Sequence, residues 1–447
     1  MPPLGRSFRL ALPLILSNLT VPLMGMVDTA VVGRIPGAHN LAAVALGAAV
    51  MNLVVWGFGF LRTATGGLAA QAFGAGDART LKAILLRSGL VAVAATAFVF
   101  LLAPFAFPAS AALFAAEGEL RATLHAYLVV RILGTPFILG GQVLTGWFLG
   151  RQETGVPLLV MLTANLLNAA LDVVLVLGLG YGVAGAAAAT VAGDAAGLAV
   201  ALLVLRRRWP TLRAASPALR EVAAKDPLLR LLALGRDIFL RTMALQGAFL
   251  AFAALAAREG ALVVAANAVL LNFFTLQAHG LDGFADAAEA TAGRAVGGGR
   301  LSDLHDAVKA AFVNAGLLAA LLSLSFWAFG EAIVALLTTL PEVRAEAGRY
   351  LGFVALLPPL SVAAFVWDGV FFGATRGREI RNAMGLAFAA FLPLAFLLRP
   401  FGNAGLWTAL LAFLVLRGFL LTFLYRRAGW GAGFMPEKTA AATATTP

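Results

Sequence analysis

The sequence lacks cysteine and is poor in charge. None of its 447 residues is cysteine, which excludes a disulfide framework, a thiolate metal site and a cysteine nucleophile. Only 12% of the residues are charged, whereas a soluble domain carries about 25%. Hydrophobic residues make up 61% of the chain, and the mean hydropathy is +0.90. These values predict an all-α polytopic membrane protein.

The motifs of common catalytic sites are missing too. The sequence contains no G-x-S-x-G, no H-E-x-x-H and no G-K-[ST], and its four histidines are scattered along the chain. We therefore predict that the chain is not an enzyme, that it carries no cofactor and that ATP does not power it directly.

Apolar runs of about 20 residues, long enough to cross a hydrocarbon core of ~30 Å, recur along the whole chain. They predict twelve spans. The approximate limits are 10–32, 42–73, 83–107, 124–149, 156–178, 183–205, 230–257, 261–290, 308–338, 349–373, 382–400 and 404–425. A polar, proline-broken connection follows the sixth span. We predict a six-helix bundle over 1–215, a second over 216–435, and a disordered tail over 436–447.

Glycine motifs recur in the two halves at a nearly constant separation. The matching positions, each 223 apart, are Gly74 and Gly297, Gly146 and Gly369, Phe148 and Phe371, and Gly150 and Gly373. Because each half has an even number of spans, the repeats are predicted to run parallel. Such repeats rock about a midplane cavity in several secondary transporters.

Basic residues gather on one side of the predicted spans. Under the positive-inside rule this distribution places both termini in the cytoplasm. The net charge of +11 then indicates topology and attraction to anionic lipids, so we expect membrane lipids and no nucleic acid among the partners.

Two acids lie within apolar spans of the first half. A charged side chain in the hydrocarbon costs about 2.5–3.5 kcal/mol on insertion scales, yet Asp28 and Asp172 have no cation close in sequence and no counterpart in the second half. Asn168 lies one helical turn before Asp172, and Thr190 lies early in the next span. These four side chains could converge inside the first bundle. The plainer interpretation is that Asn168 and Thr190 only bond neighbouring helices.

Other side chains of the first half could line a cavity for varied flat hydrophobic compounds, since methionine surfaces repack easily. Ordinary helix packing is the alternative for each of them. The candidates are Ser17, Met24, Trp56, Phe148, Met161 and Asn165.

Several segments together resemble one family. "LPLILSNLTVPLMGMVDTAVVG", "AQAFGAGD", "GRDIFLRT", "AANAVLLNF", "GLDGFADAAEA" and "DGVFFGATRG" resemble the multidrug and toxic compound extrusion (MATE) transporters, in particular their DNA-damage-inducible F (DinF) branch. The resemblance covers nearly the whole chain. It implies a V-shaped pair of six-helix bundles that exchanges H⁺ or Na⁺ for amphipathic, often cationic drugs.

The resemblance also implies roles for particular residues. A cation site would comprise Asp28, Asn168, Asp172 and Thr190, and would hold H⁺ or alternatively Na⁺. Pro13 would be the point where the first helix bends, which is reasonable because an internal proline lacks a donor and clashes with the preceding turn.

The second half departs from the other large branch of the family, which places an acid on the seventh span. Here that span carries only Asp237 at its start, and we expect Asp237 to pair with Arg241. Asp368 on the tenth span matches that branch, but without a seventh-span partner it does not predict a complete ion site.

An acidic stripe lies on the eighth span, where Asp282, Asp286 and Glu289 share one helical face. It could line the interior of the second bundle, or it could pair with Arg417 and Arg294. We favour structural pairing, and keep Asp282 and Asp286, together with Asp368, as secondary candidates.

Together with these residues, the resemblance implies a monomeric secondary active efflux transporter in the cytoplasmic membrane of a bacterium. Two adjacent carboxylates in low dielectric resist double ionisation, so one is expected to bind a proton near neutral pH. A proton and a cationic drug would then bind exclusively and favour different conformations. The alternative is a flippase of a lipid-linked precursor on a related fold, but such a protein should present several cations to its cavity.

Overall fold

The computed structural model describes residues 3–213 and 217–436. The side chains of residues 21, 23, 209–213 and 219 also lie outside the description. The predicted boundary between the halves, at 215 and 216, and all but the first residue of the predicted tail fall outside the described residues. Both remain predictions.

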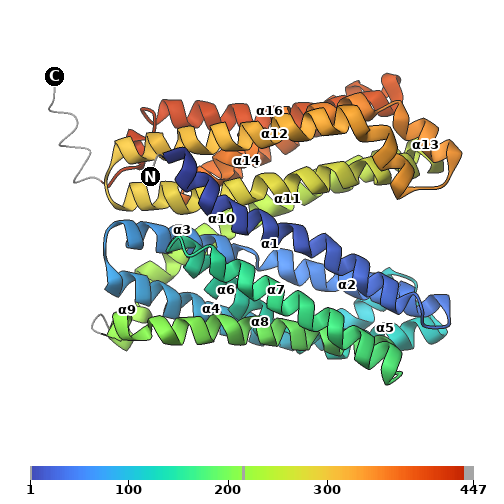
Figure 1. The fold of residues 1–447 in the computed structure, drawn as a ribbon, viewed down its shortest axis with the longest axis horizontal. Helices are drawn as coiled ribbons and strands as arrows, with labels where there is room; N and C mark the ends of the chain where they lie inside the picture. The colour runs from blue at the N-terminus through green and yellow to red at the C-terminus, as the bar shows by residue number, and fades with distance from the viewer. Residues whose placement is uncertain (1–2, 214–216, 437–447) are drawn as a thin grey trace. The chain divides into compact units, whose positions relative to one another are not determined.

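The described segments form helices joined by short loops, with no strand among them (Figure 1). The first ten elements are α1 (Pro3–Val32), α2 (Ala38–Gly57), α3 (Phe60–Gly74), α4 (Ala78–Leu113), α5 (Gly118–Ile132), α6 (Thr135–Gly150), α7 (Gly155–Asp172), η1 (Val173–Gly178), α8 (Gly182–Arg213) and α9 (Leu219–Val222). The remaining elements are α10 (Lys225–Glu259), α11 (Ala261–Gly297), α12 (Leu301–Leu337), α13 (Pro341–Gly348), α14 (Leu351–Gly373), α15 (Gly377–Leu397), η2 (Arg399–Phe401), α16 (Gly402–Arg427) and η3 (Ala432–Phe434).

The predicted twelve-span, all-helical fold is confirmed. Eleven helical segments of the described chain are long and apolar enough to cross a membrane, and the bent pair α5 and α6 supplies a twelfth. This pair was predicted as one continuous span over 124–149, but it bends by 45° between Ile132 and Thr135. Large apolar side chains such as Leu336 and Trp327 are 86% and 79% exposed, as expected for surfaces that contact lipid.

The chain divides into two compact units. One comprises Leu16–Gly235; the other comprises Met1–Ile15 together with Arg236–Pro447. The division therefore falls within α1, just after Pro13, and within α10. We call the two parts the first unit (residues 16–235) and the second unit (the remainder), and describe each separately.

The glycine repeat predicted from the sequence corresponds to the same close helix contact within each unit. In the first unit α6 packs on α3, and in the second α14 packs on α11. At four of the repeated glycines a Cβ atom would overlap a backbone carbonyl of the facing helix. The pairs are Gly146 with Arg62, Gly150 with Gly66, Gly369 with Ala285, and Gly373 with Glu289. The facing residues are themselves 223 positions apart, so the repeat extends to both sides of the contact.

We expect Gly146→Ala and Gly369→Ala each to destabilise the protein by about 1–3 kcal/mol, the usual cost of overpacking a close contact. Thermal unfolding in detergent measures the effect. Gly141→Ala on α6 and Gly352→Ala on α14 are matched controls, because a Cβ there meets nothing within 4 Å. Equal melting temperatures for the repeat variants and their controls would contradict this account of the packing.

The short helix α9 is anchored to α4 of the first unit by hydrogen bonds. The buried guanidinium of Arg87 on α4 donates to the backbone carbonyls of Glu221 (2.9 Å) and Val222 (3.2 Å). The Glu221 side chain pairs with Arg79, and this hydrogen-bonded guanidinium holds the pKa of the Glu221 carboxyl below its usual value. The short helix α9 is therefore held against α4 in the first unit.

Candidate functional site

Asp28 and Asp172 lie next to each other in the first unit. The Asp172 side chain has no exposed surface, and neither of its carboxyl oxygens accepts a hydrogen bond from a donor in the described part of the chain. Asp28 is half-buried, and its carboxyl lies within hydrogen-bonding reach of Asp172. Two carboxyl groups can bond to each other only when a proton lies between them. The arrangement can therefore hold one shared proton.

The amide of Asn168 connects this acid pair to α8. In one orientation its nitrogen donates to Oγ1 of Thr190 at 3.3 Å. In the turned orientation the nitrogen donates to Oδ1 of Asp28 at 3.1 Å, while the amide oxygen accepts from the backbone N–H of Thr190 at 3.2 Å. We assign the second orientation because it satisfies both ends of the amide. The four residues of the predicted cation site thus meet in one place.

Local backbone structure explains how α7 and α8 approach each other here. Gly193 on α8 lies so close to α7 that a Cβ would be 2.6 Å from the Ala164 carbonyl oxygen and 3.1 Å from the Cβ of Asn168. Gly197, four residues on, faces the same helix. Small residues at this spacing let membrane helices pack backbone to backbone.

Asp172 is the last residue of α7 before a π-helical turn, η1. Such turns are rare and are found frequently at functional sites. This turn could not be predicted from the sequence, because its residues are all apolar or glycine and continue the predicted fifth span.

An ion pair in the same unit was not expected from the sequence. Arg131 on α5 bonds to Asp194 on α8 at 3.1 Å, and their side chains are 12% and 25% exposed. The Arg131 charge acts on Asp28, and the Tyr127 hydroxyl lies beside Arg131. The signal was nevertheless present, since each of these two residues is an isolated charge inside a predicted apolar span, and such charges usually pair.

The structure places the other candidates of the first half differently. Ser17 is buried, and Met24 and Met161 are half-buried. Asn165 donates to Oγ1 of Thr20 at 2.9 Å, which ties α7 to α1 at a residue that the sequence analysis did not single out.

Two aromatic candidates also differ from each other. Trp56 is 44% exposed on α2. Phe148 has no exposed surface and packs edge-on against Trp147, with ring centroids 5.2 Å apart. The structure therefore places Phe148 in the core rather than at a cavity wall, because it packs in a buried apolar cluster with Leu81 and Leu144.

In the second unit, Asp368 on α14 is neutralised by two arginines. Arg241 and Arg417 both donate to its Oδ2 atom, and all three side chains are no more than 14% exposed. Each guanidinium also lies near an aromatic ring, Arg241 near Phe372 and Arg417 near Phe365. Asp368 thus differs from the acid pair of the first unit, in which no arginine bonds directly to either carboxyl among the described residues.

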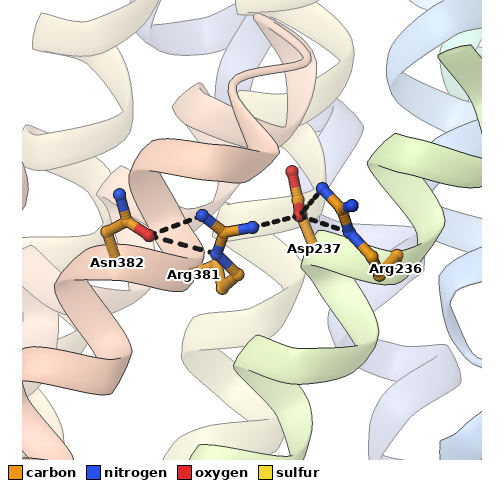
Figure 2. A network of polar contacts seen from close by, with 4 residues as sticks. All are labelled: Arg236, Asp237, Arg381 and Asn382. Atoms are coloured by element: carbon orange, nitrogen blue, oxygen red, sulfur yellow. Dashed lines mark hydrogen bonds and ion pairs between the residues drawn. The ribbon is translucent and has the colours of Figure 1, made fainter.

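The expected pairing of Asp237 with Arg241 is wrong. Figure 2 shows that Asp237 accepts instead from Arg236, its neighbour in sequence, and from Arg381 on α15 at 2.7 Å. Arg381 in turn donates to the Asn382 side chain. Arg241 pairs with Asp368 instead, because this buried carboxylate requires a counter-charge.

The acidic stripe on α11 is mixed in character. Asp282 is exposed, whereas Asp286 and Glu289 are 8% and 1% exposed. Each of the three has an interaction partner. Arg417, a predicted partner of the stripe, bonds to Asp368 and feels the charge of Asp282.

Comparisons with known proteins agree with this geometry. Residues 13–174 and 238–400 each match the MatE family, one match in each half. DNA damage-inducible protein F of Escherichia coli is 40% identical over 94% of this chain and 91% of its own length. A probable multidrug resistance protein NorM of Deinococcus radiodurans is 32% identical over 95% of this chain and 96% of its own length. A crystal structure of a MATE in the bent conformation superposes with a TM-score of 0.89 at 19% identity, covering 99% of this chain and 98% of that one.

A helical protein with twelve candidate spans and a polar cluster inside one unit has the architecture of a membrane transporter, so this is an integral membrane protein. The chain belongs to the MatE family, whose members are transporters rather than enzymes.

Proposed function

We propose that this chain is a secondary active multidrug efflux transporter that exchanges H⁺ for amphipathic, often cationic organic compounds by alternating access. The observation that carries the proposal is the acid pair of half-buried Asp28 and buried Asp172, which has no bonded counter-ion among the described residues. An ionised pair attracts a cation, and a protonated pair does not, so proton and drug compete for the same carboxylates.

We favour H⁺ over Na⁺ because a proton satisfies both carboxyl groups of the pair at once. Na⁺ at Asp28, Asn168, Asp172 and Thr190 is the alternative. Pro13 supports a conformational response, since it lies in α1 on the same helix as Asp28 and immediately before the division between the units. We further propose a monomer in the cytoplasmic membrane of a bacterium, organised as lobes over 1–215 and 216–435, with both termini in the cytoplasm.

Efflux from proteoliposomes tests the proposal. Vesicles are loaded with the cationic dye rhodamine 6G, and release is followed under an imposed pH gradient, an imposed Na⁺ gradient, or neither. We expect the pH gradient to accelerate release above the rate without a gradient, and the Na⁺ gradient to have no effect. Release driven by the Na⁺ gradient alone would show that Na⁺, and not H⁺, is the coupling ion. No response to either gradient would refute antiport.

The same vesicles address the flippase alternative. Translocation of a fluorescent lipid-linked pyrophosphate is not expected, because the first-unit cluster is acidic and would repel a pyrophosphate. Translocation of this lipid at a rate comparable with dye efflux would favour the flippase.

A further inference from the structure

Three helices of the first unit each present two polar residues one turn apart to the same region. On α5 they are Tyr127 and Arg131, on α7 Asn168 and Asp172, and on α8 Thr190 and Asp194, and α1 adds Asp28. Residues at this spacing lie on one helical face. The proposed coupling site is therefore part of a larger polar cluster that contains a second pair of opposite charges.

The bend between α5 and α6 makes room for the arginine of that second pair. Gly134 lies at the bend, and a Cβ there would be 2.9 Å from Nη1 of Arg131 and 3.2 Å from a methyl group of Val191. Glycine at this position allows the guanidinium to turn toward α8 and reach Asp194.

The charges in the cluster add up in a simple way. With one proton on the acid pair, Asp28 and Asp172 carry a single negative charge between them. Arg131 and Asp194 cancel each other, so the cluster as a whole keeps that single negative charge. Without Asp194, Arg131 would be an internal cation whose charge already acts on Asp28, and it would compete with any cationic ligand.

We propose that the Arg131–Asp194 pair determines the charge specificity of the first-unit site, with Asp194 cancelling Arg131 so that the site accepts a cation. Arg131 in turn limits the negative charge that the cluster can accumulate. The inference rests on the proposed function, and it assigns the pair a role in selecting the ligand rather than in the coupling step.

Binding of two matched dyes to the purified protein in detergent tests this assignment. Rhodamine 6G is a monocation, and its free acid rhodamine 19 shares the ring system but is a zwitterion at neutral pH. Fluorescence polarisation gives both affinities for the wild type, Asp194→Asn, Arg131→Gln and the double variant. Arg121→Gln is the matched control, because Arg121 is an exposed arginine on the same helix.

We expect Asp194→Asn to weaken rhodamine 6G binding about tenfold and Arg131→Gln to strengthen it about tenfold, as one unit charge at roughly 10 Å would. Rhodamine 19 affinity should change much less, and the double variant should return close to the wild type. A purely structural pair would instead shift both single variants in the same direction, or shift both dyes equally. Either result would overturn the inference, as would no shift.

Breaking a partly buried ion pair can be destabilising enough that a single variant fails to fold. The double variant leaves neither charge of the pair without its partner, and it completes the double-mutant cycle. If only one single variant folds, comparing it with the double variant still measures how removing one charge changes the dye affinity. The direction of that change is still predicted.

Equal binding of rhodamine 6G by the wild type and by Asp28→Asn would refute the proposed function itself. Asp28-dependent binding without opposite shifts would refute only the role of the Arg131–Asp194 pair.

Discussion

Asp28→Asn is expected to insert and fold normally and to reduce efflux driven by a pH gradient to the rate of protein-free vesicles. The amide keeps the shape of the side chain but cannot exchange a proton, and it removes the charge that attracts a cation. Proteoliposome efflux and thermal unfolding measure the two outcomes separately. Asp172→Asn should behave in the same way, because the two carboxyls act as one site.

An exposed acid outside the cluster provides the control for this prediction. Asp306 lies on α12 and is exposed, so Asp306→Asn should transport at the wild-type rate. Wild-type transport by Asp28→Asn would show that the acid pair is not the coupling site. Equal loss in Asp306→Asn would point to a general effect of negative charge.

Asp368→Asn is expected to destabilise the protein by about 3–5 kcal/mol, the usual cost of leaving buried charges unpaired. Arg241 and Arg417 would lose the carboxylate that they share, and their low exposure keeps water from replacing it. Unfolding in detergent by denaturant or heat gives the loss. The molecules that remain folded should still transport dye in response to a pH gradient, because the acid pair lies in the other unit.

An apolar replacement of the whole triad separates a structural role from a coupling role. A variant carrying Arg241→Met, Asp368→Leu and Arg417→Met removes all three charges and is expected to be about as stable as the wild type, as observed for other buried ion clusters. Wild-type stability of Asp368→Asn combined with lost efflux would contradict this assignment and make Asp368 part of the coupling machinery.

Much of the fold could be predicted because each span must satisfy its own backbone hydrogen bonds in a membrane, and only apolar helices do so. The runs that predicted 156–178 and 349–373 correspond closely to Gly155–Gly178 and Leu351–Gly373. The repeat could also be predicted, because close backbone contact requires glycine at Gly146 and Gly369. These matches therefore do not merely reflect the high glycine content of the chain.

The partners of charged residues were much less predictable. Asp237 and Arg241 have suitable helical spacing, yet each bonds elsewhere, because the tertiary fold brings Arg381 and Asp368 within reach. The Arg131–Asp194 pair joins two residues that are 63 positions apart in the sequence. Local periodicity holds no information about such distances, although it correctly indicates that a charge within an apolar span needs a partner.

The π-helical turn η1 has a consequence for sequence changes near Asp172. Its last hydrogen bond runs from the N–H of Leu179 to the carbonyl of Val174 at 2.9 Å, so the segment holds one residue more than an α-helical turn of the same span. Deleting a single residue between Val173 and Gly178 would restore α-helical pitch and leave Asp172 where it is. Insertion of one residue before Asp172 would instead rotate its carboxyl by about 100° around the helix axis. The segment behind Asp172 should therefore tolerate a change in length that the segment before it does not.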